Sequence, residues 1–389
     1  MTPAARISAA IEVLDAIRAG VSAEQALTNW ARRSRFAGSG DRAALRDHVF
    51  DVLRRWRSCA VSGGGETGRA LMLGALRAQG IDPDTLFTGT GHAPAPLTAA
   101  ERDGGAPPEG AAALDLPDWL WPRFQAALGA EAEVAAEALR HRAPVMLRVN
   151  PRRGTAADAI ARLAAEGIVA EPCEIAMNAL QVTGGERKIA TSSAYLEGVV
   201  ELQDGSSQAA MERLDVAPDA RVLDYCAGGG GKTLALAARA EARWVAHDAA
   251  PERMKDLPAR AARAGVAVRV MDHAALHAAA PFDLVLCDVP CSGSGTWRRT
   301  PEAKWRLTPE RLRELTRLQT QILAEASRMV APGGVLAYAT CSVLNEENHD
   351  VISYFQCKHP EWNISGQEHW PISRQGDGFF LVQLCRVNG

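Results

Sequence analysis

Residues 222–239, VLDYCAGGGGKTLALAAR, run from a short apolar segment through four consecutive glycines into a helix-forming segment. An apolar run, a glycine-rich turn and a helical pattern in this order predict a strand–loop–helix unit. Glycines let the backbone approach a ligand closely, and the amino end of a helix favours an anionic group. The stretch therefore predicts the first strand and the ligand loop of an α/β domain.

The segments downstream repeat this alternation. Short apolar runs recur at 243–248, 266–272, 282–288 and 333–341, and helix-like stretches separate most of them. Strands that alternate with helices predict a doubly wound parallel sheet. Ligands of such sheets bind beyond the carboxyl ends of the strands. We therefore expect the site at the acids that end the first four runs, namely Asp224, Asp248, Asp272 and Asp288.

Three interpretations of the glycine loop compete. The Walker A pattern fits Gly231-Lys232-Thr233, and 282–288 resembles a Walker B strand, but Cys226 stands where the first Walker A glycine belongs. The dinucleotide pattern G-x-G-x-x-G fails at Thr233. A loop for S-adenosylmethionine needs a ribose acid after the second strand. Asp248 lies 24 residues after Asp224, close to the roughly 20 residues typical of a ribose acid.

Two cysteines decide between these interpretations. Cys291 follows the fourth strand in DVPCSGSG (288–295), and Cys341 follows the fifth in TCSV (340–343). ATP hydrolysis needs no thiol at this edge of the sheet. Methylation of cytosine at carbon 5 does need one. A thiolate that adds to carbon 6 makes carbon 5 nucleophilic toward a methyl sulfonium, and a second thiol can assist release. The remaining cysteines are predicted to be core, loop-shaping or inert residues: Cys59, Cys173, Cys226, Cys287, Cys357 and Cys385.

These motifs resemble those of the Sun-family RNA 5-cytosine methyltransferases, of the RsmB type that acts on small-subunit ribosomal RNA. The family's D-x-C-A-A-P-G-G-K-T corresponds to DYCAGGGGKT here, and its D-A-P-C-S-G-x-G corresponds to DVPCSGSG. PEAKW (301–305), TCSVLNEEN (340–348) and GDGFF (376–380) match further family stretches. The resemblance implies a Rossmann-like class I methyltransferase domain with a seven-stranded sheet. It also implies S-adenosylmethionine as the cofactor and 5-methylcytosine in RNA as the product.

The resemblance assigns roles to individual residues. Cys341 would be the nucleophile, Cys291 the releasing cysteine and Asp288 the acid that contacts the cytosine ring. The residues expected to bind the cofactor are Cys226, Ala227, Gly228, Gly229, Gly230, Gly231, Lys232, Asp248, Asp272 and Asp288.

One departure from the family pattern lies in the cofactor loop, where Gly228-Gly229 replace Ala-Pro. Proline fixes φ near −65°, and glycine removes that restraint. We therefore expect a less preorganised loop and a weaker affinity for the cofactor.

The whole chain, at 389 residues, is long enough for two or three domains. Helical spacing near the start predicts a helical domain at 1–86, which resembles the NusB-like RNA-binding domain of the family. A Gly/Pro/Ala-rich linker is expected at 87–114, and a helical connector with a small α+β, RNA-contacting module at 115–215. The methyltransferase domain is expected at 216–389.

The charge distribution favours an RNA partner. The formal net charge is −3, but residues 1–60 carry ten Lys/Arg against six Asp/Glu, and 296–317 carry seven against three, so each has a net charge of +4. Lys304, Arg298 and Arg299 are expected to face RNA phosphates or, as surface residues, solvent. No apolar run reaches 18 residues and no secretory apolar core is present, so we expect no membrane partner and a cytoplasmic monomer. No metal is expected.

Several alternatives stay open at this point. Small-subunit ribosomal RNA is the expected substrate, and transfer RNA is the alternative because related catalytic domains act on it. A P-loop NTPase would bind ATP through Lys232 and transfer no methyl group. A non-catalytic RNA-binding assembly factor would bind RNA and ignore the cofactor.

Overall fold

The computed structural model describes residues 1–386 and divides the chain into two compact units. One consists of Met1–Arg142 together with Trp297–Arg306, and the other of Ala143–Thr296 and the chain from Leu307 onward. Residues 87–142 therefore group with the N-terminal helices. The boundaries expected at 86, 114 and 215 do not coincide with this division, and we keep them as a proposal about function.

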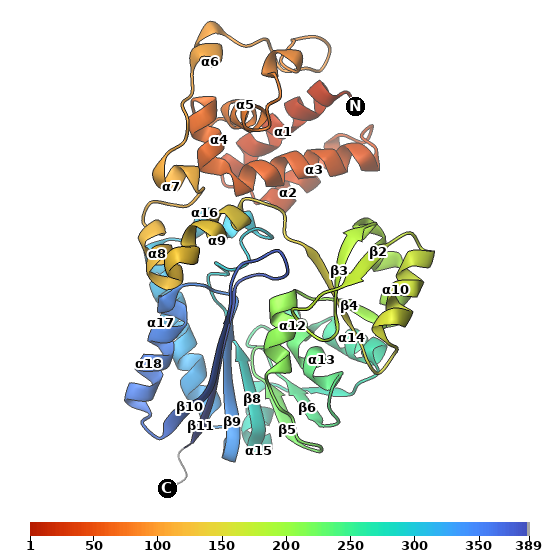
Figure 1. Ribbon diagram of the computed structural model, residues 1–389, viewed down its shortest axis with the longest axis vertical. Helices are drawn as coiled ribbons and strands as arrows, with labels where there is room; N and C mark the ends of the chain where they lie inside the picture. The colour runs from red at the N-terminus through yellow and green to blue at the C-terminus, as the bar shows by residue number, and fades with distance from the viewer. Residues whose placement is uncertain (387–389) are drawn as a thin grey trace. The chain divides into compact units, whose positions relative to one another are not determined.

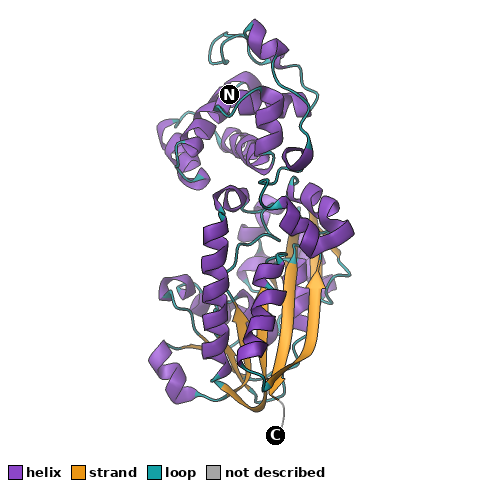
Figure 2. Cartoon of the chain, turned by 90° about the vertical axis from the view of Figure 1, so that its left-hand side faces the viewer, coloured by secondary structure: helices purple, strands orange, loops and turns teal. Residues whose placement is uncertain are grey.

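The first unit consists of helices and loops and contains no strand (Figures 1 and 2). Its core gathers apolar residues that recur at helical spacing, such as Ile7, Leu14, Leu45 and Val49. Its helices are α1 (Pro3–Arg18), α2 (Ala23–Arg33), α3 (Ser39–Arg54), α4 (Trp56–Gly63), α5 (Gly68–Ala78), α6 (Ala99–Asp103), α7 (Gly110–Ala113), α8 (Trp121–Leu128), α9 (Ala132–Leu139) and α16 (Pro301–Arg306).

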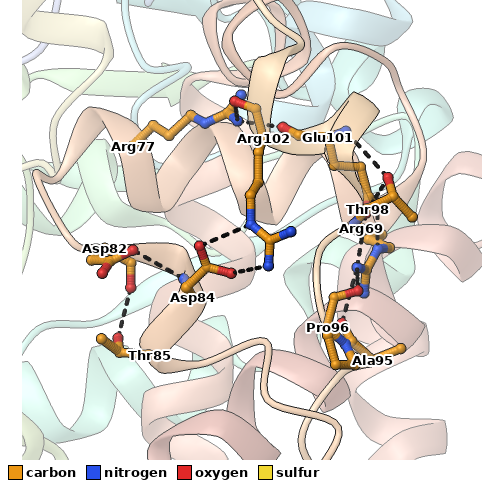
Figure 3. A network of polar contacts seen from close by, with 10 residues as sticks. All are labelled: Arg69, Arg77, Asp82, Asp84, Thr85, Ala95, Pro96, Thr98, Glu101 and Arg102. Atoms are coloured by element: carbon orange, nitrogen blue, oxygen red, sulfur yellow. Dashed lines mark hydrogen bonds and ion pairs between the residues drawn. The ribbon is translucent and has the colours of Figure 1, made fainter.

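Arginines of α5 hold part of the Gly/Pro/Ala-rich stretch in place (Figure 3). Arg69 forms an ion pair with Glu101 at 2.6 Å, and Arg77 donates to the carbonyls of Ser62, Gly104 and Glu101. Hydrogen bonds from Arg69 lower the pKa of Glu101 to about 2. Residues 87–114 are thus mostly loop, as their composition predicts, but they contain α6 and α7 and are fastened to α5.

A small antiparallel sheet with the order β2-β3-β1-β4 begins the second unit. This sheet and the helices beside it form a small α+β module, as the sequence predicts, around a core that includes Leu147, Leu163 and Leu180. The elements are β1 (Val145–Val149), α10 (Ala156–Ala165), β2 (Val169–Pro172), β3 (Ala179–Gly184), α11 (Ser193–Leu196) and β4 (Val200–Leu202).

The large sheet has seven strands in the order β10-β11-β9-β8-β5-β6-β7. The five predicted runs form the parallel strands, and β11 runs antiparallel to both of its neighbours. The predicted α/β fold is confirmed. The strands are β5 (Arg221–Asp224), β6 (Arg243–Ala246), β7 (Val268–Val270), β8 (Phe282–Asp288), β9 (Val330–Thr340), β10 (Trp362–Trp370) and β11 (Phe379–Arg386).

Helices cover both faces of this sheet (Figure 1). The first face carries α15 (His273–Ala279), α17 (Pro309–Ser327) and α18 (His349–Lys358), through residues such as Leu276, Leu323 and Phe355. The other carries α12 (Gly205–Glu212), α13 (Gly231–Ala237) and α14 (Leu257–Ala264). This double winding brings the loops after β5, β6, β7, β8 and β9 to one edge of the sheet.

Candidate functional site

The glycine loop leaves the carboxyl end of β5 and enters α13. Gly228 and Gly230 adopt φ values of +49° and +77°, in the left-handed region that glycine occupies at little cost. A Cβ on Gly230 would lie 2.1 Å from Leu257 Cδ1, so α14 packs directly against the loop backbone. A Cβ on Gly231 would meet no atom of the described chain within 4 Å. The loop therefore leaves open space beside the first turn of α13.

Asp248 fastens this loop to the end of β6. Its carboxylate, which is buried, accepts hydrogen bonds from the backbone N–H groups of Gly228 and Ala250, each at 2.9 Å. It also pairs with Arg253 at 3.1 Å. A carboxylate has about four lone-pair sites, so acceptor capacity remains for a ligand hydroxyl.

Two further acids lie at the same edge. Asp224 is buried and accepts a hydrogen bond from Thr233 Oγ1 at 2.6 Å, while its Oδ1 atom has no hydrogen-bond partner within residues 1–386. Burial raises the pKa of Asp224 to about 6. Asp272 is exposed and caps α15 by accepting from the N–H of Ala275 at 2.8 Å.

Lys232, at the start of α13, pairs with Asp288 at the end of β8, with 2.5 Å between Nζ and Oδ2. Burial opposes the charged form of Lys232, but the Asp288 carboxylate outweighs that effect and raises the pKa of the ammonium group. The glycine loop and the fourth parallel strand are thus joined by an ion pair. The ammonium group of Lys232 is therefore already paired with the Asp288 carboxylate.

The two motif cysteines come together at the next loops. The Sγ atoms of Cys291 and Cys341 lie 3.4 Å apart, although the residues are 50 positions apart in sequence. The hydrogen bond with Cys341, together with burial, raises the pKa of the Cys291 thiol well above its ordinary value. Adjacent thiols resist ionising together, because two negative charges would face each other. The geometry therefore allows one thiolate and one thiol.

Sequence reasoning missed three residues that hold this edge together. Arg260, on α14, donates to the carbonyl of Gly229, and Arg253 pairs with Asp248. Glu347 accepts hydrogen bonds from the loops that carry both cysteines. A signal for Glu347 exists, since it lies within the TCSVLNEEN stretch; the two arginines carry no motif.

The expectation for two of the basic residues after β8 is wrong. Lys304 and Arg298 are only 1% and 3% exposed, so they face neither RNA phosphates nor solvent. Lys304 Nζ donates to the carbonyl of Arg54 at 3.1 Å within the helical unit. Arg299 is exposed, as expected. The physical reason is that the segment 297–306 packs against helices from the other end of the chain.

The residues at the sheet edge fit S-adenosylmethionine. That cofactor carries a sulfonium, an ammonium group and two ribose hydroxyls, all of which suit carboxylate partners. The edge offers the unused buried oxygen of Asp224, the remaining acceptor capacity of Asp248 and the exposed Asp272. The open space beside Gly231 adjoins the amino end of α13. Among residues 1–386, no group of His, Cys, Asp and Glu side chains forms a metal site.

Comparisons with known proteins match the chain to methyltransferases. Residues 211–385 match the family model described as "16S rRNA methyltransferase RsmB/F", and residues 116–187 match an RsmF/B-like ferredoxin-like domain. The chain is 34% identical over 288 residues to "Ribosomal RNA small subunit methyltransferase B" of Xylella fastidiosa, across 69% of this chain and 67% of that protein. It is 32% identical over 313 residues to the protein of the same name from Xanthomonas campestris, across 75% and 71%.

Solved structures show the same architecture. The crystal structure of PH0851 superposes with a TM-score of 0.77 and 25% identity, covering 99% of each chain. A methyltransferase homologue from Pyrococcus horikoshii gives a TM-score of 0.59 and 25% identity, over 70% of this chain and 96% of that one. The fold is thus that of Rossmann-like methyltransferases. Within residues 1–386, no helix combines the length and the apolar character needed to cross a membrane.

Proposed function

The chain belongs to the RsmB/F family of 16S rRNA methyltransferases, and from that premise we propose that it forms 5-methylcytosine in RNA. It takes the methyl group from S-adenosylmethionine, as a methyltransferase of this family. Small-subunit ribosomal RNA is the favoured substrate, because two relatives are named for that activity. The observation that carries the proposal is the pair of sulfurs 3.4 Å apart beside the glycine-loop edge.

In this proposal the loop from Cys226 to Lys232, with Asp248 and Asp272, holds the cofactor. When bound, S-adenosylmethionine supplies an electrophilic methyl group on a sulfonium. Gly228 and Gly230 let the loop backbone approach it, and the bond from Gly228 to Asp248 sets the loop's position. Arg260 donates a hydrogen bond to the Gly229 carbonyl of the same loop.

Cys341 is the proposed nucleophile. Its thiolate forms a bond to carbon 6 of the target cytosine, and the electron pair displaced from the 5,6 double bond makes carbon 5 nucleophilic. Asp288 lies beside Lys232, so the pair can hold a proton near the ring nitrogen and stabilise the adduct. After methylation, the proton on carbon 5 passes to a base, and the electron pair of that C–H bond re-forms the 5,6 double bond. The bond between sulfur and carbon 6 then breaks, and Cys341 leaves as a thiolate.

Cys291 is the proposed releasing cysteine. Its raised pKa keeps it a thiol at neutral pH, 3.4 Å from the sulfur that forms the adduct. An uncharged thiol at that distance can donate a hydrogen bond to the Cys341 thiolate before attack and as it leaves. RNA contact requires the target base to be splayed out, since stacking in a duplex covers the faces of carbons 5 and 6. We infer action in the cytoplasm, and we expect a monomer.

Methyl transfer from labelled S-adenosylmethionine tests the reaction, with unmodified small-subunit RNA and transfer RNA in parallel. Label on cytosine carbon 5 in the ribosomal RNA supports the reaction and the substrate class. Label confined to transfer RNA keeps the reaction and overturns the substrate. Label in neither RNA, with cofactor binding intact, overturns the proposal in favour of an assembly factor that binds without turnover.

The cysteine roles have their own test. Cys341→Ala is expected to abolish methyl transfer, because no other group supplies the bond to carbon 6. Cys291→Ala is expected to accumulate a covalent protein–RNA adduct, visible as a band that survives denaturing electrophoresis. Methylation by Cys341→Ala would overturn the assignment of the nucleophile.

A further inference from the structure

The two loops that carry Cys291 and Cys341 share one buried carboxylate. Each cysteine is followed directly by a serine, Ser292 or Ser342. Glu347 Oε2 accepts hydrogen bonds from both serine hydroxyls, from Ser342 at 2.5 Å, and Glu347 Oε1 accepts from the N–H of Ser292 at 2.7 Å. The carboxylate thus bonds to the residue next to each sulfur.

Glu347 is itself held from two directions. Its backbone carbonyl accepts from the hydroxyl of Tyr338, on β9, at 2.6 Å. Gln319, on α17, donates from Nε2 to Glu347 Oε1 at 3.0 Å and to the carbonyl of Pro290 at 2.9 Å. The segment before Cys291 is therefore tied to the same carboxylate through a helix. Glu347 is fixed relative to the sheet rather than carried by a free loop.

The free-energy cost of burying the Glu347 carboxylate has to be offset by other interactions. Glu347 is 0% exposed, and no Lys, Arg or His side chain of residues 1–386 forms an ion pair with it. Burying an unpaired carboxylate is costly unless hydrogen bonds replace those to water. Its described bonds supply that replacement only when the Cys291 and Cys341 loops meet at their present separation. The charge therefore penalises every arrangement in which one loop moves away.

We propose that Glu347 is a positioning residue that holds the Cys291 and Cys341 loops in register, so that the two sulfurs lie next to each other. This inference rests on the proposed roles of the two cysteines in forming and releasing the RNA adduct. Glu347 touches neither sulfur through any described hydrogen bond and acts through Ser292 and Ser342. None of its described hydrogen bonds reaches the glycine loop, so it should affect turnover rather than cofactor affinity.

Glu347→Gln is the main test, since it keeps the shape and removes the charge and one acceptor. The direct readout is cross-linking of Cys291 to Cys341 by diamide. The two thiols lose two hydrogens to form a disulfide, and the azo bond of diamide takes them up to become a hydrazine. Mass spectrometry of the peptides gives the rate. This readout needs neither RNA nor methyl transfer, so it remains valid if the proposed function fails.

A role of Glu347 in positioning the loops and a role of its charge alone predict opposite changes in the cross-linking rate of Glu347→Gln. Loss of the Glu347 charge lowers the pKa of the Cys291 thiol and so speeds oxidation, whereas loss of loop register slows the cross-link. We expect cross-linking to slow about 10-fold and kcat to fall about 100-fold, as misplacement by about 1 Å can cause. KM for S-adenosylmethionine should stay within about 2-fold, since the network excludes the cofactor loop. Cross-linking at the wild-type rate or faster overturns the proposal.

Matched variants complete the design. Asp350→Asn removes a carboxylate three residues away, exposed on the first turn of α18, and should leave the cross-linking rate unchanged. Ser342→Ala removes one bond to Glu347 without changing any charge, and it should slow the cross-link in the same direction as Glu347→Gln. If Glu347→Gln does not fold, Ser342→Ala carries the test, and a wild-type rate in that variant overturns the proposal.

Discussion

Gly229 shows how one residue can affect the conformation of the glycine loop. The family pattern has proline here, and in this chain the carbonyl of Gly229 accepts from Arg260. No hydrogen bond of the described residues uses the Gly229 N–H, and its φ lies outside the left-handed region. A Cβ at this position would meet only the end of the Arg260 side chain, at 2.8 Å. A ring at this position therefore requires the flexible end of Arg260 to shift, and Arg260 supplies part of the restraint that proline would give.

Gly229→Pro is expected to bind S-adenosylhomocysteine more tightly. Replacing glycine by proline at a compatible position reduces the freedom of the loop and stabilises by about 0.4–1 kcal/mol, which corresponds to about 2- to 5-fold in Kd. Isothermal titration calorimetry measures the change directly. Unchanged or weaker binding of S-adenosylhomocysteine would contradict the idea that the glycines make the loop less preorganised.

Lys304 is a second residue with a measurable signature. Burial, opposed by Asp115 and assisted by Arg140 and Arg54, lowers the pKa of Lys304 to about 7. In the unfolded chain the lysine has a pKa of about 10.4. Between these values the unfolded state binds more protons, so the free energy of unfolding rises with pH. Below about pH 7 the lysine is charged in both states and the full cost of its burial remains.

The check is a comparison of wild type with Lys304→Met in urea unfolding from pH 6.5 to 9.5. Wild type should gain stability relative to the variant as the pH rises through that window. A difference that stays constant with pH would contradict a buried lysine that titrates near 7.

At the scale of elements, the sheet edge depends on contacts from the small module. Glu201, on β4, pairs with Arg263 at 2.9 Å and with Arg260 at 3.5 Å, both on α14. Arg260 also donates a hydrogen bond to the Gly229 carbonyl. The antiparallel module thus contacts α14, the helix that in turn contacts the glycine loop. This link gives the module a structural role beside the proposed contact with RNA.

Glu201→Gln should therefore weaken both stability and cofactor binding. Loss of a mostly buried charged acceptor costs about 1–3 kcal/mol, and the Kd for S-adenosylhomocysteine should rise a few-fold. Urea unfolding and calorimetry give the two values. Glu197→Gln, in the same module, is the control: its ion pair with Arg162 is exposed, and such pairs contribute about 0–1 kcal/mol. Equal effects of the two variants would contradict the link.

At the scale of the whole molecule, one segment packs in a different unit from the segments that flank it in sequence. Residues 297–306 lie in sequence between β8 and α17, yet they pack in the helical unit. Trp297 is 0% exposed and stacks on Phe124 with 5.9 Å between ring centroids. Trp305 Nε1 donates to the carbonyl of Leu53 at 2.6 Å. The segment that follows the Cys291 loop therefore depends on the N-terminal helices for its structure.

A fragment of residues 143–389 should leave this segment open to proteolysis. Trypsin is expected to cut after Arg298 and Lys304 at least about 10-fold faster in the fragment than in the full chain, because buried bonds are cleaved only from opened states. Mass spectrometry of timed digests resolves both sites, and cleavage after the exposed Arg313 serves as the internal control. Equal rates in both proteins would contradict the dependence.

Local patterns were sufficient for much of the fold and for the candidate site. The glycine loop, the acids at strand ends and the cysteines after β8 and β9 are readable because each depends on a few consecutive residues and on the periodicity of strands and helices. Parallel winding then brings their ends to one edge. The family resemblance added the roles, which remain to be tested.

Only the tertiary structure determines which residues that are distant in sequence contact each other. The burial of Lys304, the clamp from Arg260 and the sharing of Glu347 by two loops have no local signature, because charged residues look alike in sequence whether they meet water or protein. Glu347 lies 55 positions from Ser292, and Lys304 lies 250 positions from Arg54. Packing brings such pairs together, and the cost of an unpaired buried charge then determines which of them hold the site in place.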